Sequence, residues 1–304
     1  MKILVIKLGA LGDFVQAMGP AAAIRAHHPE AEITLLTTAP FAELARKAPY
    51  FDRVWIDERP GLFDLGGLWR LRQKLRDGFD RVYDLQTSSR STRYYPLMGP
   101  DPRPEWSGIV PGVALEHANP QRNFMHTIDR QKDQLAVAGI TEVPLSDLSW
   151  AATDPAAFEL PLPYLLLVPG GAKHRPAKRW PAGRYSQLAG QAAKLGITPV
   201  VIGGPDERDA GREIARNCPA ARDLIGQTSF GDIIGLAQGC GYAVGNDTGP
   251  MHLIVAAGAP ATVLYSAESD PALTQPRGTD VTVLQRPDLG DLSVDEVAAT
   301  IRIS

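Results

Sequence analysis

Short apolar runs alternate with longer amphipathic segments along both halves of the chain, and this alternation limits the fold more than any other feature of the sequence. Short apolar runs bounded by glycine or polar residues are typical of buried parallel strands, and apolar residues spaced three or four apart are typical of helices that cover a sheet. The pattern therefore predicts βαβ units arranged as two Rossmann-like, doubly wound α/β domains that face each other across a cleft.

The expected elements follow from the same pattern. In the first half, strands are expected at residues 3–7, 33–37, 54–56 and 81–84, and helices at 13–27, 41–47, 65–76 and 127–138, with an irregular Pro-rich stretch at 96–120. In the second half, strands are expected at 164–168, 198–202, 242–244, 262–265 and 281–284, and helices at 182–195, 207–217, 230–238, 251–257 and 293–301. Residues 141–163 have little periodicity and are expected to form the linker, which gives an N-terminal domain at 1–158 and a C-terminal domain at 159–304.

Composition excludes several classes of protein. Two cysteines in 304 residues are too few for a disulfide framework or a four-thiolate zinc site. A net charge of −3 argues against a dedicated nucleic-acid-binding protein. Lys7 and Asp13 interrupt what would have to be the apolar part of a signal peptide, and the mostly apolar stretch at 253–265 is shorter than the ~18 residues of a membrane span. We therefore expect a cytoplasmic protein.

Glycine-rich loops follow several of the expected strands, where ligands bind in parallel sheets. The first, Leu8-Gly9-Ala10-Leu11-Gly12-Asp13, allows a ligand to approach the backbone closely at Gly9 and Gly12. Asp13 then opens a helix, and this carboxylate is either a functional group or only the cap of that helix. The Gly-x-x-Gly spacing lacks the third glycine of a dinucleotide fingerprint.

A second glycine-containing loop, Gly245-Asn246-Asp247-Thr248-Gly249-Pro250, is typical of an anion site. Free N–H groups at a helix N-terminus attract phosphate, and the hydroxyl of Thr248 can donate one more hydrogen bond. A well-capped helix after a buried strand is the alternative. His252 lies one turn into the helix and is expected to be a packed polar residue or part of the motif.

A basic loop follows the strand that ends in Pro169-Gly170-Gly171. Residues 160–205 contain no Asp or Glu, and Lys173, Lys178 and Arg179 lie in or next to this loop. Its position favours binding of a diphosphate over a merely solvated loop. Glu207, in the next loop, is either a ribose ligand or a carboxylate of a first helical turn. The sequence has neither an Asp-x-Asp metal clamp nor a Gly-x-x-x-x-Gly-Lys-Ser/Thr phosphate loop.

Three segments resemble one known family. They are KILVIKLGALGDFVQAMGPAAAIRAHHP, PGGAKHRPAKRWP and GQTSFGDIIGLAQGCGYAVGNDTGPMHLIVAAGAP, and they are similar to glycosyltransferase family 9, the ADP-heptose:lipopolysaccharide heptosyltransferases. The resemblance implies a GT-B fold with the acceptor on the N-terminal domain and the nucleotide sugar on the C-terminal one. It implies metal-independent, inverting transfer of a heptose or related sugar from an ADP-sugar, with no cofactor. The acceptor would be a lipopolysaccharide core or another anionic lipid-linked saccharide at the inner face of the inner membrane.

The resemblance also assigns roles to residues. Asp13 matches the general base, and Lys178 matches the catalytic lysine that holds the donor diphosphate. The other residues expected to bind the donor are Gly12, Gly170, Glu207, Asp247, Thr248, Gly249 and His252. Gln86, Arg90 and Arg93 are expected to bind the acceptor, and no metal ligands are expected.

One departure from the family and several rival functions stay open. Tyr265-Ser266-Ala267 stands where the family usually has Phe-Gly, near the nucleotide. The same fold also serves nucleotide-sugar epimerases and hydrolases, which consume the donor without an acceptor. A non-catalytic nucleotide-sugar-binding protein would bind without turnover, and an NAD-dependent oxidoreductase would require nicotinamide binding.

Overall fold

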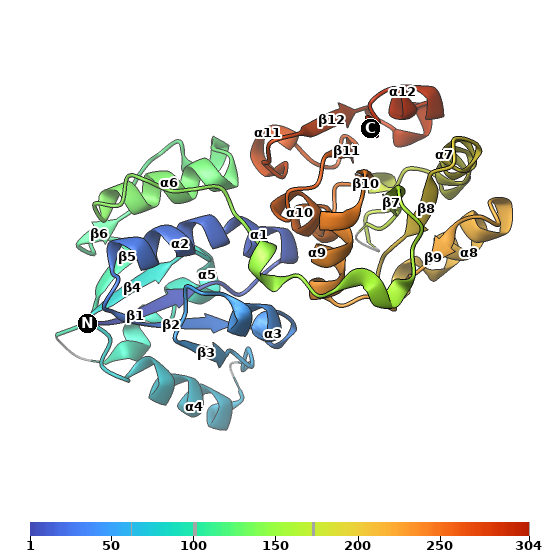
Figure 1. Cartoon of the computed structure of the whole chain (residues 1–304). Helices are drawn as coiled ribbons and strands as arrows, with labels where there is room; N and C mark the ends of the chain where they lie inside the picture. The colour runs from blue at the N-terminus through green and yellow to red at the C-terminus, as the bar shows by residue number, and fades with distance from the viewer. Residues whose placement is uncertain (62, 100–101, 172–173, 304) are drawn as a thin grey trace. The chain divides into compact units, whose positions relative to one another are not determined.

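Two six-stranded parallel sheets form the framework of the chain in a computed structural model that describes residues 1–61, 63–99, 102–171 and 174–303 (Figure 1). Each sheet belongs to its own unit, Met1–Ser146 or Asp147–Ser304. The two predicted doubly wound α/β domains are confirmed by this topology and by its match to solved structures described below.

In the N-terminal unit the strand order is β3-β2-β1-β4-β5-β6. The strands are β1 (Lys2–Ile6), β2 (Glu32–Thr37), β3 (Arg53–Ile56), β4 (Arg81–Asp84), β5 (Glu105–Gly108) and β6 (Leu115–Glu116). The helices are α1 (Leu11–Gln16), α2 (Met18–His27), α3 (Ala39–Lys47), α4 (Leu65–Leu75), α5 (Ser89–Thr92) and α6 (Thr127–Val137). Central β1 pairs with β2 and β4, so that Ile3 lies between Ile33 and Arg81.

Both faces of this sheet are covered by helices, as the apolar character of β1 requires. Alternate β1 residues Leu4 and Ile6 pack in one apolar cluster with Leu71 and Leu75 of α4. Figure 1 shows α2 and α6 over one face of the sheet and α4 on the other side. The carboxyl ends of the strands therefore stay uncovered for loops that can bind ligands.

In the C-terminal unit the strand order is β12-β11-β10-β7-β8-β9. The strands are β7 (Tyr164–Val168), β8 (Thr198–Val201), β9 (Arg222–Asp223), β10 (Tyr242–Asn246), β11 (Ala261–Tyr265) and β12 (Val281–Gln285). The helices are α7 (Ala182–Lys194), α8 (Arg208–Asn217), α9 (Phe230–Gly239), α10 (Gly249–Ala256), α11 (Pro271–Thr274) and α12 (Val294–Ala298). The apolar sides of α7, α8 and α12 form one cluster with β7 and β10.

The structure differs from the sequence prediction at a few elements. The expected irregular stretch at 96–120 contains β5, with buried Trp106, and the short β6. The single helix expected at 13–27 is divided into α1 and α2 at Ala17. The two-residue β9 was not predicted.

The units divide between residues 146 and 147, whereas the sequence placed the division between 158 and 159. The segment that follows residue 147 is hydrogen-bonded to the C-terminal unit. The Leu148 N–H donates to the Ala256 carbonyl at 3.0 Å, and the Thr153 N–H donates to the Gly231 carbonyl at 3.2 Å. Because α9 and α10 supply these acceptors, residues expected to form a linker pack as part of this unit.

Within the described ranges, no helix is long and apolar enough to cross a bilayer.

The packing of residues 147–158 on α9 can be tested at Gly235. A Cβ atom at this position would lie 2.0 Å from the Thr153 carbonyl oxygen, so we expect Gly235→Ala to lower the free energy of unfolding by about 1–3 kcal/mol. Gly190 of α7 is the matched control, because a Cβ there meets nothing within 4 Å. Gly190→Ala should stabilise the unit by about 0.5–1 kcal/mol, since alanine favours helix. Urea-induced unfolding measures both, and equal stability of the two variants would contradict this packing.

Candidate functional site

The loop after β1 is fixed through both backbone polar groups of Leu8. The Leu8 N–H donates to Gln86 Oε1 at 2.8 Å. The Leu8 carbonyl accepts from Thr38 Oγ1 and from Arg59 Nη2, both at 3.0 Å. Gln86, Thr38 and Arg59 follow β4, β2 and β3 in turn. Segments after three different strands therefore hold the loop that leads to Asp13. Gln86, which was expected to bind the acceptor, is thus already engaged in positioning this loop.

Asp13 is not the cap of its helix. The N-cap of α1 is Ala10, no side chain caps that helix end, and Asp13 lies in the first turn. The capping alternative is therefore wrong, and the carboxylate is half-buried in the first helical turn. Gly9 has φ +127°, and a Cβ there would lie 2.8 Å from the ring of Phe41, so glycine is required for the turn. Gly12 is the helix residue directly before Asp13.

Two buried charged groups lie beneath this loop. Lys7 Nζ donates to the Leu85 carbonyl at 3.1 Å. Burial lowers the pKa of Lys7, and the nearby negative charges of Asp13 and Asp84 oppose that shift. Asp84 is fully buried at the end of β4, where its Oδ1 accepts two N–H groups of the following turn at 3.0 and 3.1 Å. Burial raises the pKa of Asp84 to about 6, although these hydrogen bonds and the charge of Lys7 oppose the shift.

Neither group was predicted as part of a site. Lys7 and Asp84 each stand at the polar end of an apolar strand run, and that position is the signal in the sequence that could have identified them.

The predicted acceptor residues Arg90 and Arg93 lie together at a cavity of about 340 Å³. Its wall combines the two guanidinium-bearing residues with apolar side chains, and it consists of Pro60, Gly61, Leu68, Leu71, Ser89, Arg90, Arg93, Tyr94 and Leu97. Such a cavity suits a ligand that carries both an anionic group and an apolar or sugar surface. Gln86 does not line it.

The buried amide of Asn246 organises the loops of the C-terminal unit. Its Nδ2 donates to the carbonyls of Pro169 and Gly170, both at 2.9 Å. Its Oδ1 accepts from the Trp180 N–H and the Tyr185 hydroxyl, both at 3.0 Å. The amide joins the end of β10 to the loop after β7 and to the start of α7. Asn246 lies within the predicted loop, but the sequence does not identify it as a site residue, because its partners are distant in the sequence.

Lys178 and Asp247 form the charged centre of this unit. Lys178 Nζ lies 2.5 Å from Asp247 Oδ2, and the side chains are only 13% and 11% exposed. Lys178 ends a short 3-10 helix, Pro176–Lys178, directly before the segment that Asn246 holds. A partly desolvated ammonium group at this place attracts anions more strongly than an exposed lysine does.

The N-terminus of α10 adjoins Asp247. Thr248 is the N-cap residue, but its hydroxyl makes no capping hydrogen bond to the helix in the described structure. Gly249 is the first helical residue, and His252 is buried in the first turns. Lys178 and Thr248, two residues of the expected anion site, therefore lie beside the start of α10. Pro250 has no N–H there and the Met251 N–H donates to the Thr248 carbonyl at 3.1 Å, so Gly249 supplies the backbone N–H at this helix end.

Glu207 packs between two glycine-rich loops. Its Oε2 accepts from the Gly204 N–H at 2.8 Å, and its Oε1 lies 3.9 Å from Arg179 Nη2. A Cβ at Gly170 would approach its carboxyl carbon at 3.2 Å. Glu207 therefore lies at the start of a helix, and it also lies beside the loop at Gly170. Lys173 of the basic loop lies outside the described residues.

Tyr265, the departure from the family pattern, is fully buried at the end of β11. Burial, and next the negative charge of Asp247, raise the pKa of its hydroxyl, which places the two groups near each other.

Most of the predicted residues lie in loops at the carboxyl ends of strands, whereas Gly12, expected to bind the donor, lies beside Asp13 in the N-terminal unit. Gly170, Lys178, Glu207, Asp247, Thr248 and Gly249 belong to loops at one edge of the second sheet, and Asp13, Gln86, Arg90 and Arg93 follow strands of the first. Among the residues that the structure describes, no three His, Cys, Asp or Glu side chains converge as a metal site.

The sequence matches a known family. The profile described as glycosyltransferase family 9 (heptosyltransferase) matches residues 68–294. Lipopolysaccharide heptosyltransferase 2 of Salmonella typhimurium is 28% identical, over 94% of this chain and 88% of that protein. The protein of the same name from Escherichia coli is 26% identical over the same shares of each chain.

Solved structures share the fold. A family 9 glycosyl transferase from Veillonella parvula superposes with a TM-score of 0.85 at 20% identity, over 98% of this chain and 95% of that one. The E. coli heptosyltransferase WaaC, solved with ADP, gives 0.81 at 19% identity over 99% of each chain. A UDP-GlcNAc 2-epimerase from Methanocaldococcus jannaschii gives 0.57 at 12% identity, over 100% of this chain and 92% of that one.

The buried carboxyl of Asp84 predicts a pH dependence of stability. Its pKa of about 6 in the folded state exceeds the value of 3.8 for a solvated carboxyl, so the folded protein binds the proton more tightly. The resulting stabilisation is present at low pH and is lost as pH rises through 6. Because asparagine cannot ionise, Asp84→Asn should gain stability relative to the wild type by about 2 kcal/mol between pH 4 and pH 7. Urea unfolding at both pH values measures this difference, and a difference that does not change with pH would contradict the assignment.

Proposed function

The chain belongs to glycosyltransferase family 9, and we propose that it moves a heptose or related sugar from an ADP-sugar to a lipopolysaccharide core or another lipid-linked saccharide. We further propose that transfer inverts the anomeric carbon and needs no metal ion. The observation that carries the proposal is the partly buried ion pair of Lys178 and Asp247, which lies beside the N-terminus of α10. The relatives named heptosyltransferase, and the ADP bound to one of them, support the choice of donor.

The donor diphosphate would bind where Lys178 now meets Asp247. A diphosphate carries more negative charge than one carboxylate, so it competes well for the lysine ammonium. The Thr248 hydroxyl and the Gly249 N–H at the start of α10 would add neutral donors to the same anion. Glu207, next to Gly170, lies where it can accept from ribose hydroxyl groups.

In the proposed reaction Asp13 takes the proton of an acceptor hydroxyl as that oxygen attacks the anomeric carbon. The new carbon–oxygen bond forms while the bond from that carbon to the diphosphate oxygen breaks, and the electron pair leaves with ADP. Lys178 and the Gly249 N–H would stabilise the charge that develops on the departing phosphate. General-base catalysis of this kind contributes about 10²–10⁴-fold.

The acceptor would bind to the N-terminal unit through Arg90 and Arg93. Their cavity accepts an anionic group, as the phosphates or carboxylates of a lipid-linked saccharide would provide. Gln86 acts in this proposal by fixing Leu8 and therefore the loop of Asp13. The enzyme would work at the cytoplasmic face of the inner membrane, where such acceptors are anchored.

The rival functions predict different assays. A nucleotide-sugar epimerase or hydrolase would consume the ADP-sugar in the absence of an acceptor, and a binding protein would not consume it at all. The family match favours the transferase, because the likeness to the epimerase concerns the fold alone.

Removal of the lysine should weaken binding of the nucleotide. Lys178→Ala should raise the Kd for ADP by about 10- to 100-fold, since one charge-assisted contact to phosphate is lost. Thermal shift with ADP, UDP, GDP, CMP and NADH measures this, because ligand at 100 times its Kd stabilises by about 2.7 kcal/mol. Lys194→Ala, an exposed lysine at the end of α7, is the control and should behave as the wild type. A response to NADH alone, or to none of the five, would reject the diphosphate site.

Replacement of the proposed base should separate binding from turnover. Asp13→Asn should lower kcat by about 10²–10⁴-fold and leave the ADP-induced thermal shift unchanged, because the carboxylate acts on the acceptor proton. Glu43→Gln, an exposed carboxyl of α3 in the same unit, is the matched control. Release of ADP from ADP-heptose with a lipopolysaccharide acceptor measures turnover. Near wild-type turnover by Asp13→Asn would show that another group takes the proton.

A further inference from the structure

Three large apolar side chains face solvent at the start of α4. Phe63, Leu65 and Trp69 are 98%, 76% and 61% exposed, and all three lie within seven consecutive positions. Apolar side chains of this size scattered singly over a surface need no explanation, but a local cluster of them marks a surface that binds something. The other residues of α4 indicate what kind of partner would fit this cluster.

Helix α4 has two distinct faces. Gly67, Leu71 and Leu75 are its buried residues, and the two leucines belong to the apolar cluster that packs on the sheet. At 100° per residue, Leu65, Trp69, Arg72 and the following Arg76 lie on the opposite, exposed side. This surface, completed by Phe63 just before the helix, is called the outer face of α4. Its apolar residues stand at one end and its arginines at the other.

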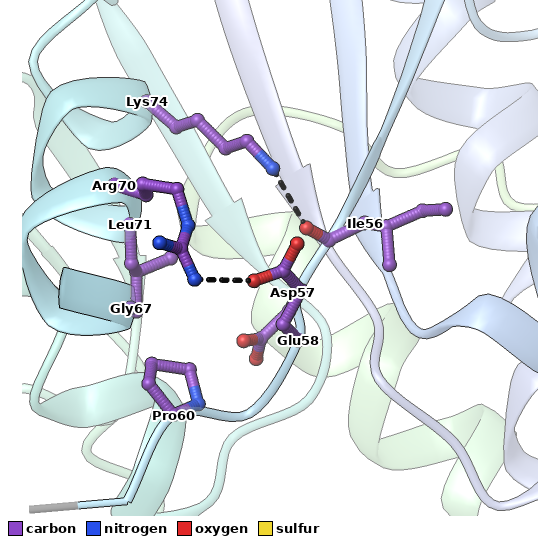
Figure 2. A pocket seen from close by; sticks show the side chains of 8 residues that line it. All are labelled: Ile56, Asp57, Glu58, Pro60, Gly67, Arg70, Leu71 and Lys74. Atoms are coloured by element: carbon purple, nitrogen blue, oxygen red, sulfur yellow. Dashed lines mark hydrogen bonds and ion pairs between the residues drawn. The ribbon is translucent and has the colours of Figure 1, made fainter. Parts of the chain in front are cut away.

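The basic residues of α4 divide between two tasks. Figure 2 shows Arg70 and Lys74 pointing toward the end of β3, where Arg70 lies 3.2 Å from Glu58 and Lys74 donates to the Ile56 carbonyl at 2.9 Å. These two contacts attach the helix to the sheet. Arg72 and Arg76 form no ion pair with any residue that the structure describes, and residues 65–76 contain no acidic side chain. The outer face therefore offers uncompensated positive charge beside exposed aromatic rings.

We propose that the outer face of α4 binds the surface of a lipid bilayer that contains anionic lipids. Aromatic and leucine side chains enter the region between headgroups and acyl chains, and arginines bind lipid phosphates while their stems stay in the apolar layer. A second copy of the chain fits less well, because packing through the same face would bring like-charged arginines together. The proposal commits to a bilayer on this charge complementarity.

Docking in this way also serves the acceptor, a step that rests on the proposed function. Leu68 and Leu71 of α4 line the cavity that holds Arg90 and Arg93. A bilayer bound to the outer face would therefore lie on the other side of the same helix from the cavity. The lipid part of the acceptor would stay in the bilayer while its saccharide extends past α4 toward the arginines.

Flotation of the full-length protein with vesicles tests the proposal. Vesicles of phosphatidylcholine alone are compared with vesicles in which part of the lipid is phosphatidylglycerol. We expect the wild type to bind the anionic vesicles more strongly. Arg72→Gln with Arg76→Gln should weaken binding to anionic vesicles by about 30-fold. Phe63→Ser with Trp69→Ser should weaken binding to both kinds of vesicle by at least about tenfold.

Matched variants control for charge and apolar area. Arg212 and Arg216 of α8 are also exposed and four residues apart, so Arg212→Gln with Arg216→Gln removes the same charge elsewhere. Phe124→Ser with Leu195→Ser removes comparably exposed apolar side chains elsewhere. Both controls should bind vesicles as the wild type does. Equal binding by the patch variants and their controls, or no binding by the wild type, would overturn the proposal.

Two further readouts separate this proposal from its alternatives. Sedimentation without vesicles identifies a self-interface: if the wild type does not bind vesicles but dimerises, and the Phe63 and Trp69 changes abolish the dimer, the bilayer proposal is wrong. The ADP thermal shift of each variant reports binding at the proposed donor site. The residues of that site belong to the C-terminal unit, whereas the outer face of α4 belongs to the N-terminal unit. Vesicle binding without any ADP response would support the docking surface and reject the proposed transferase.

Discussion

The amide of Asn246 is the constraint on which the donor side of the molecule depends. A buried asparagine has four hydrogen-bonding positions, and here each meets a backbone or hydroxyl partner at 2.9–3.0 Å. Three segments far apart in the sequence are fixed in one step: the end of β10, the loop at Gly170 and the start of α7. Lys178 precedes Trp180 by two residues, and Asp247 follows Asn246 directly, so both partners of the central ion pair are adjacent to the same amide. Loss of that amide would leave several buried polar groups unsatisfied, each costing about 1–3 kcal/mol.

In the N-terminal unit, charged groups fix the loops that follow the central strands. Asp84 ends β4 as Asn246 ends β10, and its carboxylate accepts the N–H groups of the turn that leads to Gln86. Gln86 in turn holds Leu8, and the buried Lys7 is anchored to the Leu85 carbonyl. Burying Lys7 and Asp84 is costly for each alone, and their opposite charges offset part of that cost. In the proposed mechanism these buried contacts fix the loop that carries Asp13 at the carboxyl end of the sheet.

The fold could be predicted further than the site. Apolar runs such as residues 3–6 and 164–168 are short and are soon followed by a glycine-containing loop, so the presence of strands there follows from the local pattern. Strands β5 and β6 escaped prediction because they are short, partly polar and surrounded by proline, and tertiary pairing alone defines them. Glycine-rich loops disclosed Asp13, Lys178 and Asp247, since a glycine turn followed by a polar residue is a local signal. Asn246 and Lys7 could not be assigned in this way, because their partners lie 61–78 positions away along the chain.

The two units contribute unequally to what distinguishes a transferase from its relatives in fold. An epimerase with 12% identity has the same framework at a TM-score of 0.57, so neither the sheets nor a diphosphate site alone defines the reaction. An epimerase or hydrolase needs only a donor, whereas transfer requires a second substrate to be held and deprotonated. The features that fit this second need all belong to the N-terminal unit: a carboxylate that does not cap its helix, a cavity with two arginines, and a helix whose outer face is apolar and basic. In the proposed function, the C-terminal unit therefore bears on which sugar nucleotide is used, and the N-terminal unit decides whether its sugar is transferred at all.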